Sequence, residues 1–327
     1  MKYAYIVAVL ILLVSIAGCG SNSQSSGGAA PKTPFLGGTE GLKIEFLKGS
    51  PPDEVTDTGT FDFQAVVSIK NNGEYNLKQD QVKLDIVGFL PEDFGVSQDQ
   101  LSDIRPEDDP SPRQRDSEGN IIDAATTFVT FPDQDSFFNF EGSVTGNTEF
   151  TFKADACYKY QTKALSRICV LRDLSNVDTD DICDPSQSKT IYSSGSPVKV
   201  SAFRQNVAGK DKITFSFDIT HSGTGKVFKE GDSTSQPAEC PSDPRDTRER
   251  ENRVFVTVDS GLPNLKCVGL NGATSGFVTL VTNKRSVTCT QELDPGRNDF
   301  ETNVEITVDF NYKDSVEKKV LVKHLID

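Results

Sequence analysis

Carboxylates are the side chains of this sequence with the clearest capacity for chemistry, and they gather in one segment. Residues 92–135 carry twelve Asp and Glu residues but only three basic residues, all of them arginine. Calcium is bound in proteins by several carboxylate and carbonyl oxygens on a turn that glycine permits. The candidate ligands here are Glu107, Asp108, Asp109, Asp116 and Glu118. Their spacing departs from the twelve-residue EF-hand loop, so composition favours the alternative of a solvated acidic loop.

Histidine, the usual general base, is scarce. The chain has only His221 and His324, and neither stands beside a recognisable nucleophile motif. Ser-His-Asp and Cys-His mechanisms need such an arrangement, so we expect no catalytic residues and a protein that is not an enzyme. A paired-carboxylate hydrolase, or an accessory subunit of one, is the alternative because acids are abundant and their separations cannot be derived from sequence.

Cys19 stands at the end of an N-terminus that has the features of an export signal. Lys2 precedes an apolar run, Tyr3–Ile16, and small residues follow it. This order is typical of a secretory signal peptide over residues 1–18. The segment Ile16-Ala17-Gly18-Cys19 resembles the lipobox of prokaryotic lipoproteins, which implies lipidation of Cys19 and cleavage before it. A transmembrane anchor is the alternative, although the apolar run is shorter than the ~20 residues that cross a bilayer.

Six further cysteines follow, an even number that indicates disulfides in an exported chain. Zinc sites use close pairs such as C-x-x-C, and the sequence has none. Cys157 and Cys169 have apolar neighbours of matching parity on two adjacent strand-like segments, which predicts that they face each other across a hairpin. The three expected pairs are Cys157–Cys169, Cys267–Cys289 and Cys183–Cys240.

The secondary structure that holds these residues is indicated by the alternation of polar and apolar residues, which dominates the chain. Phe61, Phe63, Ala65, Val67 and Ile69 alternate with polar residues, which is typical of antiparallel strands with one buried face. Long stretches with a helical period are not found. The sequence therefore predicts an all-β protein.

Two pairs of segments repeat. Residues 61–73 match 212–223, each an alternating strand that ends in a polar turn with glycine, and residues 149–160 match 303–313. The offsets are nearly equal, which indicates two copies of one sandwich. In each copy we expect a tight turn after the Tyr-Lys pair, with return strands over 162–171 and 316–325.

The predicted organisation is two tandem immunoglobulin-like sandwiches. The phrase Ser68–Gly73 resembles a segment of adhesion-type Ig-like modules in prokaryotic surface proteins, which implies surface domains of that kind. The predicted boundaries are a signal peptide over 1–18, lipidated Cys19 with a Gly/Ser-rich tether over 19–39, domain 1 over 40–174 with an acidic insertion at 92–135, a linker over 175–195, and domain 2 over 196–327 with a charged insertion at 229–253.

The net charge of the chain limits the kinds of partner that it can bind. The chain has 34 Lys and Arg against 48 Asp and Glu, a formal net charge of −14, which does not favour nucleic acid. We expect a lipoprotein of the cell envelope, held outside the membrane by its lipid, with a binding or structural role toward an unknown protein or envelope polymer. A cation-dependent adhesin is a further alternative, with calcium as the cation and no other cofactor expected.

Overall fold

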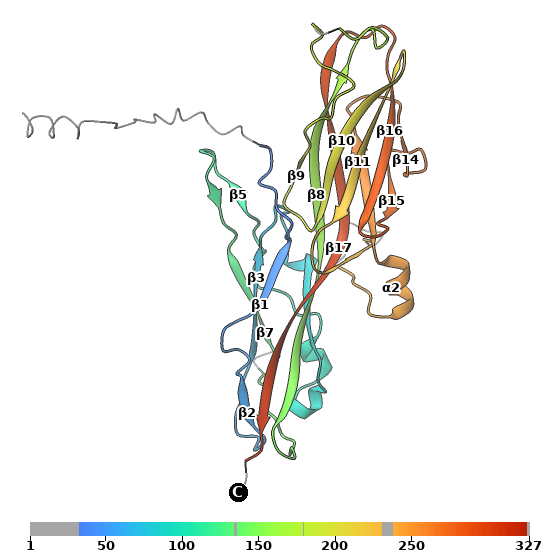
Figure 1. Ribbon diagram of the computed structural model, residues 1–327. Helices are drawn as coiled ribbons and strands as arrows, with labels where there is room; N and C mark the ends of the chain where they lie inside the picture. The colour runs from blue at the N-terminus through green and yellow to red at the C-terminus, as the bar shows by residue number, and fades with distance from the viewer. Residues whose placement is uncertain (1–32, 134–135, 179, 231–237, 326–327) are drawn as a thin grey trace, which may run out of the picture. The chain divides into compact units, whose positions relative to one another are not determined.

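The computed structural model describes residues 33–133, 136–178, 180–230 and 238–325. The predicted signal peptide and Cys19 lie outside these residues. The described chain is nearly all β, as predicted, and its strands pair antiparallel except for β2, which pairs with β17 in parallel (Figure 1). Its first-half strands are β1 Leu42–Phe46, β2 Glu54–Thr56, β3 Ala65–Asn71, β4 Val82–Val87, β5 Gln114–Arg115, β6 Ile121–Ile122, β7 Thr126–Phe131 and β8 Thr148–Val170.

The second half repeats much of this order with additions. Its strands are β9 Tyr192–Ser193, β10 Val198–Gly209, β11 Lys212–His221, β12 Lys226–Phe228, β13 Arg253–Asp259, β14 Leu265–Val268, β15 Ser275–Thr279, β16 Lys284–Glu292 and β17 Phe300–Lys323. One short helix, α2 Pro244–Arg250, and 3-10 turns at Gln79–Gln81, Pro91–Phe94 and Gln98–Leu101 complete the described elements.

The two longest strands, β8 and β17, pair antiparallel along their whole length, from Phe300↔Val170 to Val322↔Thr148. The predicted hairpins after Tyr-Lys are therefore wrong. Neither strand contains glycine or proline, so nothing in the sequence interrupts the extended backbone. Each strand runs through the position where the turn was expected and continues into the other half of the molecule.

The sheets of the two halves follow one plan. A three-stranded sheet, β1-β3-β7, lies in the first half, and a four-stranded sheet, β10-β11-β16-β14, lies in the second. The sheet that both halves share has the order β15-β13-β17-β8-β4, so β4 flanks β8 as β13 flanks β17. In the first half the ring centroids of Phe63, which lies just before β3, and Phe152 of β8 are 6.0 Å apart. This contact packs the three-stranded sheet against β8.

The repeat has a local two-fold axis at Tyr158 and Tyr312. An offset of 154 residues carries Tyr158 onto Tyr312, and these two residues are direct partners across β8 and β17. Equivalent residues that face each other across an antiparallel pair are related by a two-fold rotation. The two halves thus exchange the ends of their last strands: residues 316–322, predicted in domain 2, pair with the first-half part of β8.

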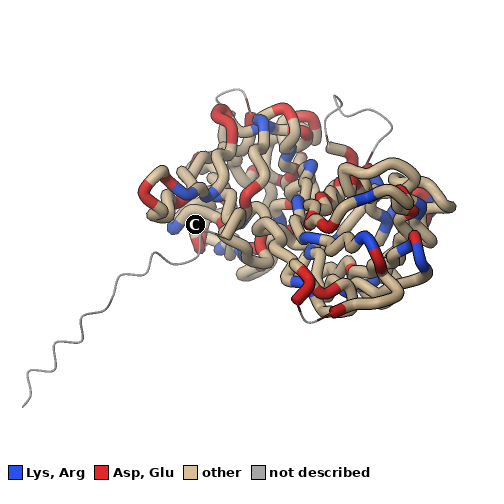
Figure 2. Tube along the Cα trace, turned by 90° about the horizontal axis from the view of Figure 1, so that it is seen from above, with Lys and Arg blue, Asp and Glu red and all other residues tan. Residues whose placement is uncertain are grey.

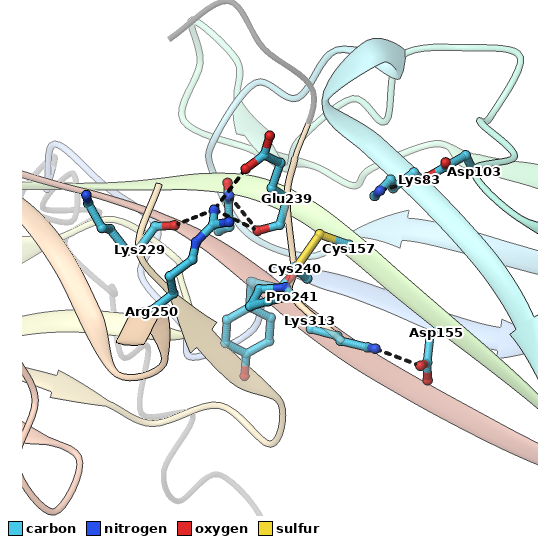
Figure 3. The surroundings of a disulfide bond; sticks show 12 residues. Lys83, Asp103, Asp155, Cys157, Lys229, Glu239, Cys240, Pro241, Arg250 and Lys313 are labelled. Carbon is cyan, nitrogen blue, oxygen red and sulfur yellow. Dashed lines mark hydrogen bonds and ion pairs between the residues drawn. A yellow bond between two sulfur atoms is a disulfide. The ribbon is translucent and has the colours of Figure 1, made fainter. Parts of the chain in front are cut away.

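The six cysteines form three disulfides, of which two differ from the expected pairs. Cys157 and Cys169 lie on one continuous strand, so they are ~40 Å apart and cannot join. The observed pairs are Cys157–Cys240, Cys169–Cys183 and Cys267–Cys289. The third is the expected one, whereas the expected Cys183–Cys240 bond is replaced by bonds from both residues to β8. Figure 3 shows the first, which fixes the chain before α2 onto β8.

The charged insertion at 229–253 contains α2. The Asp243 carboxylate accepts hydrogen bonds from the amides of Arg245 and Asp246, which caps the helix start. Arg250 lies 3.5 Å from Asp246, one turn away. This is the short, salt-bridged helical turn that such mixed charges favour.

Candidate functional site: an open sheet edge beside an acidic groove

The five candidate calcium ligands lie in two places, with Glu107, Asp108 and Asp109 along one segment beside β7 and Asp116 and Glu118 in the turn between β5 and β6. Asp116 accepts hydrogen bonds from the amides of Glu118 and Asn120, within the turn between β5 and β6. Asp109 accepts from Lys78 Nζ at 2.8 Å and from the amide of Gln79 at 2.8 Å. Within the described parts of the chain, no three His, Cys, Asp or Glu side chains are placed to share a metal ion.

Glu107 and Asp108 instead line a groove beside β7. The groove has a volume of about 600 Å³. One wall is the edge of β7, and the other is the segment 104–108, whose first residue pairs with Leu84 of β4. The described residues that line it are Gln64, Ile104, Arg105, Glu107, Asp108, Thr126, Thr127, Phe128, Val129, Thr130, Pro132 and Asp133. We call this feature the edge groove.

β7 is an outer strand, and the hydrogen-bond register shows which of its backbone groups face the groove. The amide of Leu47 donates to the carbonyl of Val66, and the amide of Asn72 donates to that of Gly41. Even-numbered residues of β3 therefore bond toward β1, and odd-numbered ones toward β7. Since Val67 pairs with Val129, the even-numbered residues of β7 direct their backbone groups away from β3.

Those outward residues are Thr126, Phe128 and Thr130. No backbone or side-chain partner within the described chain is found for their outward amides and carbonyls. Their side chains are exposed too, with Phe128 at 46%. The edge groove therefore presents a row of unsatisfied backbone donors and acceptors beside an exposed aromatic ring.

The equivalent edge in the second half is covered. β16 occupies the place of β7 in its sheet, and β14 pairs with it from Val268↔Thr288 to Leu265↔Gln291. The Cys267–Cys289 disulfide joins these two strands. The first half has no counterpart of β14 among its described strands.

β7 lies within the segment 92–135, which the sequence predicts to be an acidic insertion rather than a strand. The signal was present, because Thr127, Val129 and Phe131 alternate with Thr126, Phe128 and Thr130. Threonine, phenylalanine and valine favour strands, so this alternation predicts a half-buried one. The abundance of acids on either side obscured it.

Tyrosines occupy the centre of the molecule, where the two halves meet. The hydroxyl of Tyr158 accepts from the amide of Leu42 at 3.3 Å, and that of Tyr312 accepts from Gly225 at 2.8 Å. Burial raises the pKa of both phenols, so they stay neutral. A second pocket of about 400 Å³ lies against these rings and β1. Its neutral hydroxyls already have backbone partners, which makes them structural.

Both histidines serve structural contacts. Nε2 of His221 lies 3.1 Å from the Tyr312 hydroxyl, and burial lowers the pKa of His221. Nδ1 of His324 lies 2.6 Å from Asp57, which fixes the end of β17. Hydrogen bonding from His324 lowers the pKa of Asp57 to about 2.

Glu74 binds the backbone of the chain where the predicted tether ends and the fold begins. Its carboxylate accepts from the amides of Leu36 at 2.8 Å, Gly37 at 2.9 Å and Gly195 at 2.6 Å. A few residues later, Gly41 lies so close to Tyr158 that an added Cβ would be 2.9 Å from its hydroxyl. The chain thus enters the fold next to the two-fold axis.

Acidic and basic residues are interspersed along the described chain (Figure 2). Among the described residues, no helix is both long and apolar enough to pass through a bilayer.

Comparisons with known proteins give little. No protein-family model matches the chain, and no curated protein matches it. Among solved structures, one similar chain is the serine-rich repeat adhesion glycoprotein Srr1 from Streptococcus agalactiae. It shares 10% identity over 87% of this chain and 96% of its own, with a TM-score of 0.12. A likeness this slight informs neither topology nor function.

Proposed function

We propose that this protein is a lipid-anchored, extracytoplasmic binding protein that takes its partner in the edge groove without catalysing a reaction. The observation that carries the proposal is the open edge of β7. Exposed sheet edges invite pairing with other chains, and proteins normally cover or blunt them. The same molecule covers the equivalent edge of β16, so the exposure of β7 is specific to one half.

The location rests on two further features. The lipobox-like segment before Cys19 implies a lipid anchor, and three disulfides are consistent with an oxidising compartment. The absence of catalysis rests on the histidines, because His221 and His324 are engaged with Tyr312 and Asp57 rather than with a nucleophile.

Site-specific photo-crosslinking in cells that process lipoproteins tests the binding role. A photoreactive residue at Asp108, on the wall of the edge groove, should yield an adduct with a discrete partner. The matched position is Arg285, which is exposed on β16 in the second half and should yield none. Equal crosslinking from both positions, or none from Asp108, would contradict a binding site in the groove.

A Cys19→Ser variant tests the anchor separately. It should leave the membrane fraction and lose the mass of the lipid. Retention in the membrane with the lipid mass intact would show that Cys19 is not the attachment point.

A further inference from the structure

We propose that the occupant of the edge groove is an extended segment of another protein that adds to β7 as a fourth strand and carries Lys or Arg toward the groove wall at 104–108. This inference rests on the proposed binding function and specifies its partner. Strand addition uses the backbone groups of an exposed edge for affinity and alternate side-chain pockets for specificity.

The backbone of β7 suits an added strand. Thr126, Phe128 and Thr130 each present an amide and a carbonyl to the groove, at every second residue, which is the spacing of an antiparallel or parallel ladder. The six residues of β7 span ~20 Å, so a partner segment of about six residues would satisfy the edge.

Side chains set the chemistry of that segment. Glu107, Asp108 and Asp133 line the groove against one basic residue, Arg105. Asp109, the next acid, is already paired with Lys78. The unpaired charge is therefore negative, which favours Lys or Arg on the face of the partner that meets the wall. On the opposite face, a partner side chain across from Phe128 would cover its exposed ring, which favours an apolar residue.

The charges also argue against a second copy of this chain as the occupant. Two β7 edges paired about a two-fold axis would bring Glu107 and Asp108 of both copies together. Like charges at that separation oppose association. Alternating basic and apolar residues on another chain avoid this repulsion.

Fluorescence anisotropy with labelled ten-residue peptides tests the inference on the full-length protein in non-ionic detergent. A peptide that alternates Lys and Val should bind saturably, whereas one that alternates Glu and Val should not. Two N-methylated forms of the Lys-Val peptide then separate strand addition from simple charge attraction. Since one edge of an added strand pairs with β7, methylation of alternate amides on that edge should abolish binding, and methylation of the other set should not.

Variants of β7 provide the matched control. Phe128→Pro removes an outward amide without touching the β3 ladder and should weaken binding about fivefold or more. Phe128→Val keeps the amide and should weaken it less. Thr126→Pro, at the first residue of the strand, repeats the test at a position that tolerates proline if Phe128→Pro does not fold.

Several results would overturn the inference. Equal loss from both N-methylated peptides, or binding that Phe128→Pro and Thr126→Pro leave unchanged, would exclude strand addition. A dimer of the free protein that Phe128→Pro abolishes would assign the edge to a second copy. If Asp108 still crosslinks to a partner while the peptides or proline variants give these negative results, the proposed binding function is retained and only strand addition is excluded.

Discussion

The edge strands of the two small sheets, β7 and β16, occupy equivalent places but are finished differently. β16 is paired with β14 and joined to it by a disulfide, whereas the outward backbone groups of β7 face a groove of about 600 Å³ and have no partner among the described residues. The core alternation is the same in both, so the difference lies in what was added to one half. Pairing with β14 satisfies backbone groups on the edge of β16, whereas the proposed binding function assigns the open edge of β7 to a partner.

Hydrogen exchange should show the largest difference between these edges. The amide of Leu293 donates to Asp211, so even-numbered residues of β16 bond toward β14. The amides of Thr288 and Thr290 should exchange about a thousandfold or more slowly than those of Phe128 and Thr130. Amide-resolved exchange by NMR measures this ratio. Equal protection of both sets would mean that the β7 edge is covered.

Removing the disulfides should destabilise the protein in order of loop length. The sequence separations are 83 for Cys157–Cys240, 22 for Cys267–Cys289 and 14 for Cys169–Cys183. Chain entropy gives losses of ~4.5, ~3.4 and ~3 kcal/mol in that order. Denaturant unfolding of the three double-alanine variants tests the order. If the double variant Cys267→Ala, Cys289→Ala loses the most unfolding free energy, the disulfide stabilises the protein by holding β14 on β16 and not only by closing a loop.

The glycines that end the repeated turns should be the next most sensitive. A Cβ at Gly73 would lie 1.8 Å from the Tyr160 hydroxyl, and one at Gly223 would lie 2.2 Å from that of Tyr312. Alanine at either position should cost ~3 kcal/mol through overpacking, because backbone and ring must both move. Gly276→Ala is the control, since its Cβ would meet nothing closer than 3.8 Å. Thermal unfolding of the three variants tests this. Equal midpoints would contradict the close packing of Gly73 and Gly223 against the tyrosine hydroxyls.

Two aspartates related by the 154-residue offset have different partners. Asp155 lies 3.0 Å from Lys153 Nζ and 2.8 Å from Lys313 Nζ, whereas Asp309 accepts from the neutral amide of Gln161. Burial raises the pKa of Asp309 to about 6. Because the folded-state pKa exceeds the unfolded value, the stability from this group is present below about pH 4 and is lost as pH rises through 6.

The loss at Asp309 should be ~2–3 kcal/mol at neutral pH. Asp309→Asn should therefore stabilise the protein at pH 7 and flatten the stability profile between pH 4 and 7. Asp155→Asn should do the opposite and destabilise it, because two lysines lose their partner. Denaturant melts across this pH range decide the matter, and a parallel response of the two variants would refute the assignment.

The sequence predicted the fold class and the repeat better than it predicted connectivity. Alternation around Phe63 and Phe215 identifies strands because burial of one face has a period of two. It does not distinguish a strand that turns from one that continues, and at Tyr158–Tyr160 the chain continues. The error in the Cys157 pairing followed directly, since parity was correct but the return strand did not exist.

The candidate site was predictable only in part. Glu107 and Asp108 were singled out for their charge, and they do line a groove, but the strand opposite them was assigned to an insertion. An open edge is a property of what is missing beside β7, and a sequence does not state which strands lie next to one another. The difference between β7 and β16 becomes visible only from the strand order.

Glu74 binds the end of the predicted tether near Tyr158. Its position sets where a mechanical force on the tether would enter the fold. With the proposed lipid at Cys19 and the proposed partner strand on β7 both in place, tension between them would enter at Leu36 and Gly37 and leave across β1, β3 and β7. A pull along these strands shears their hydrogen bonds together rather than one by one. The β8–β17 pair and all three disulfides lie outside that path. Force would thus test three short strands and spare the rest of the protein.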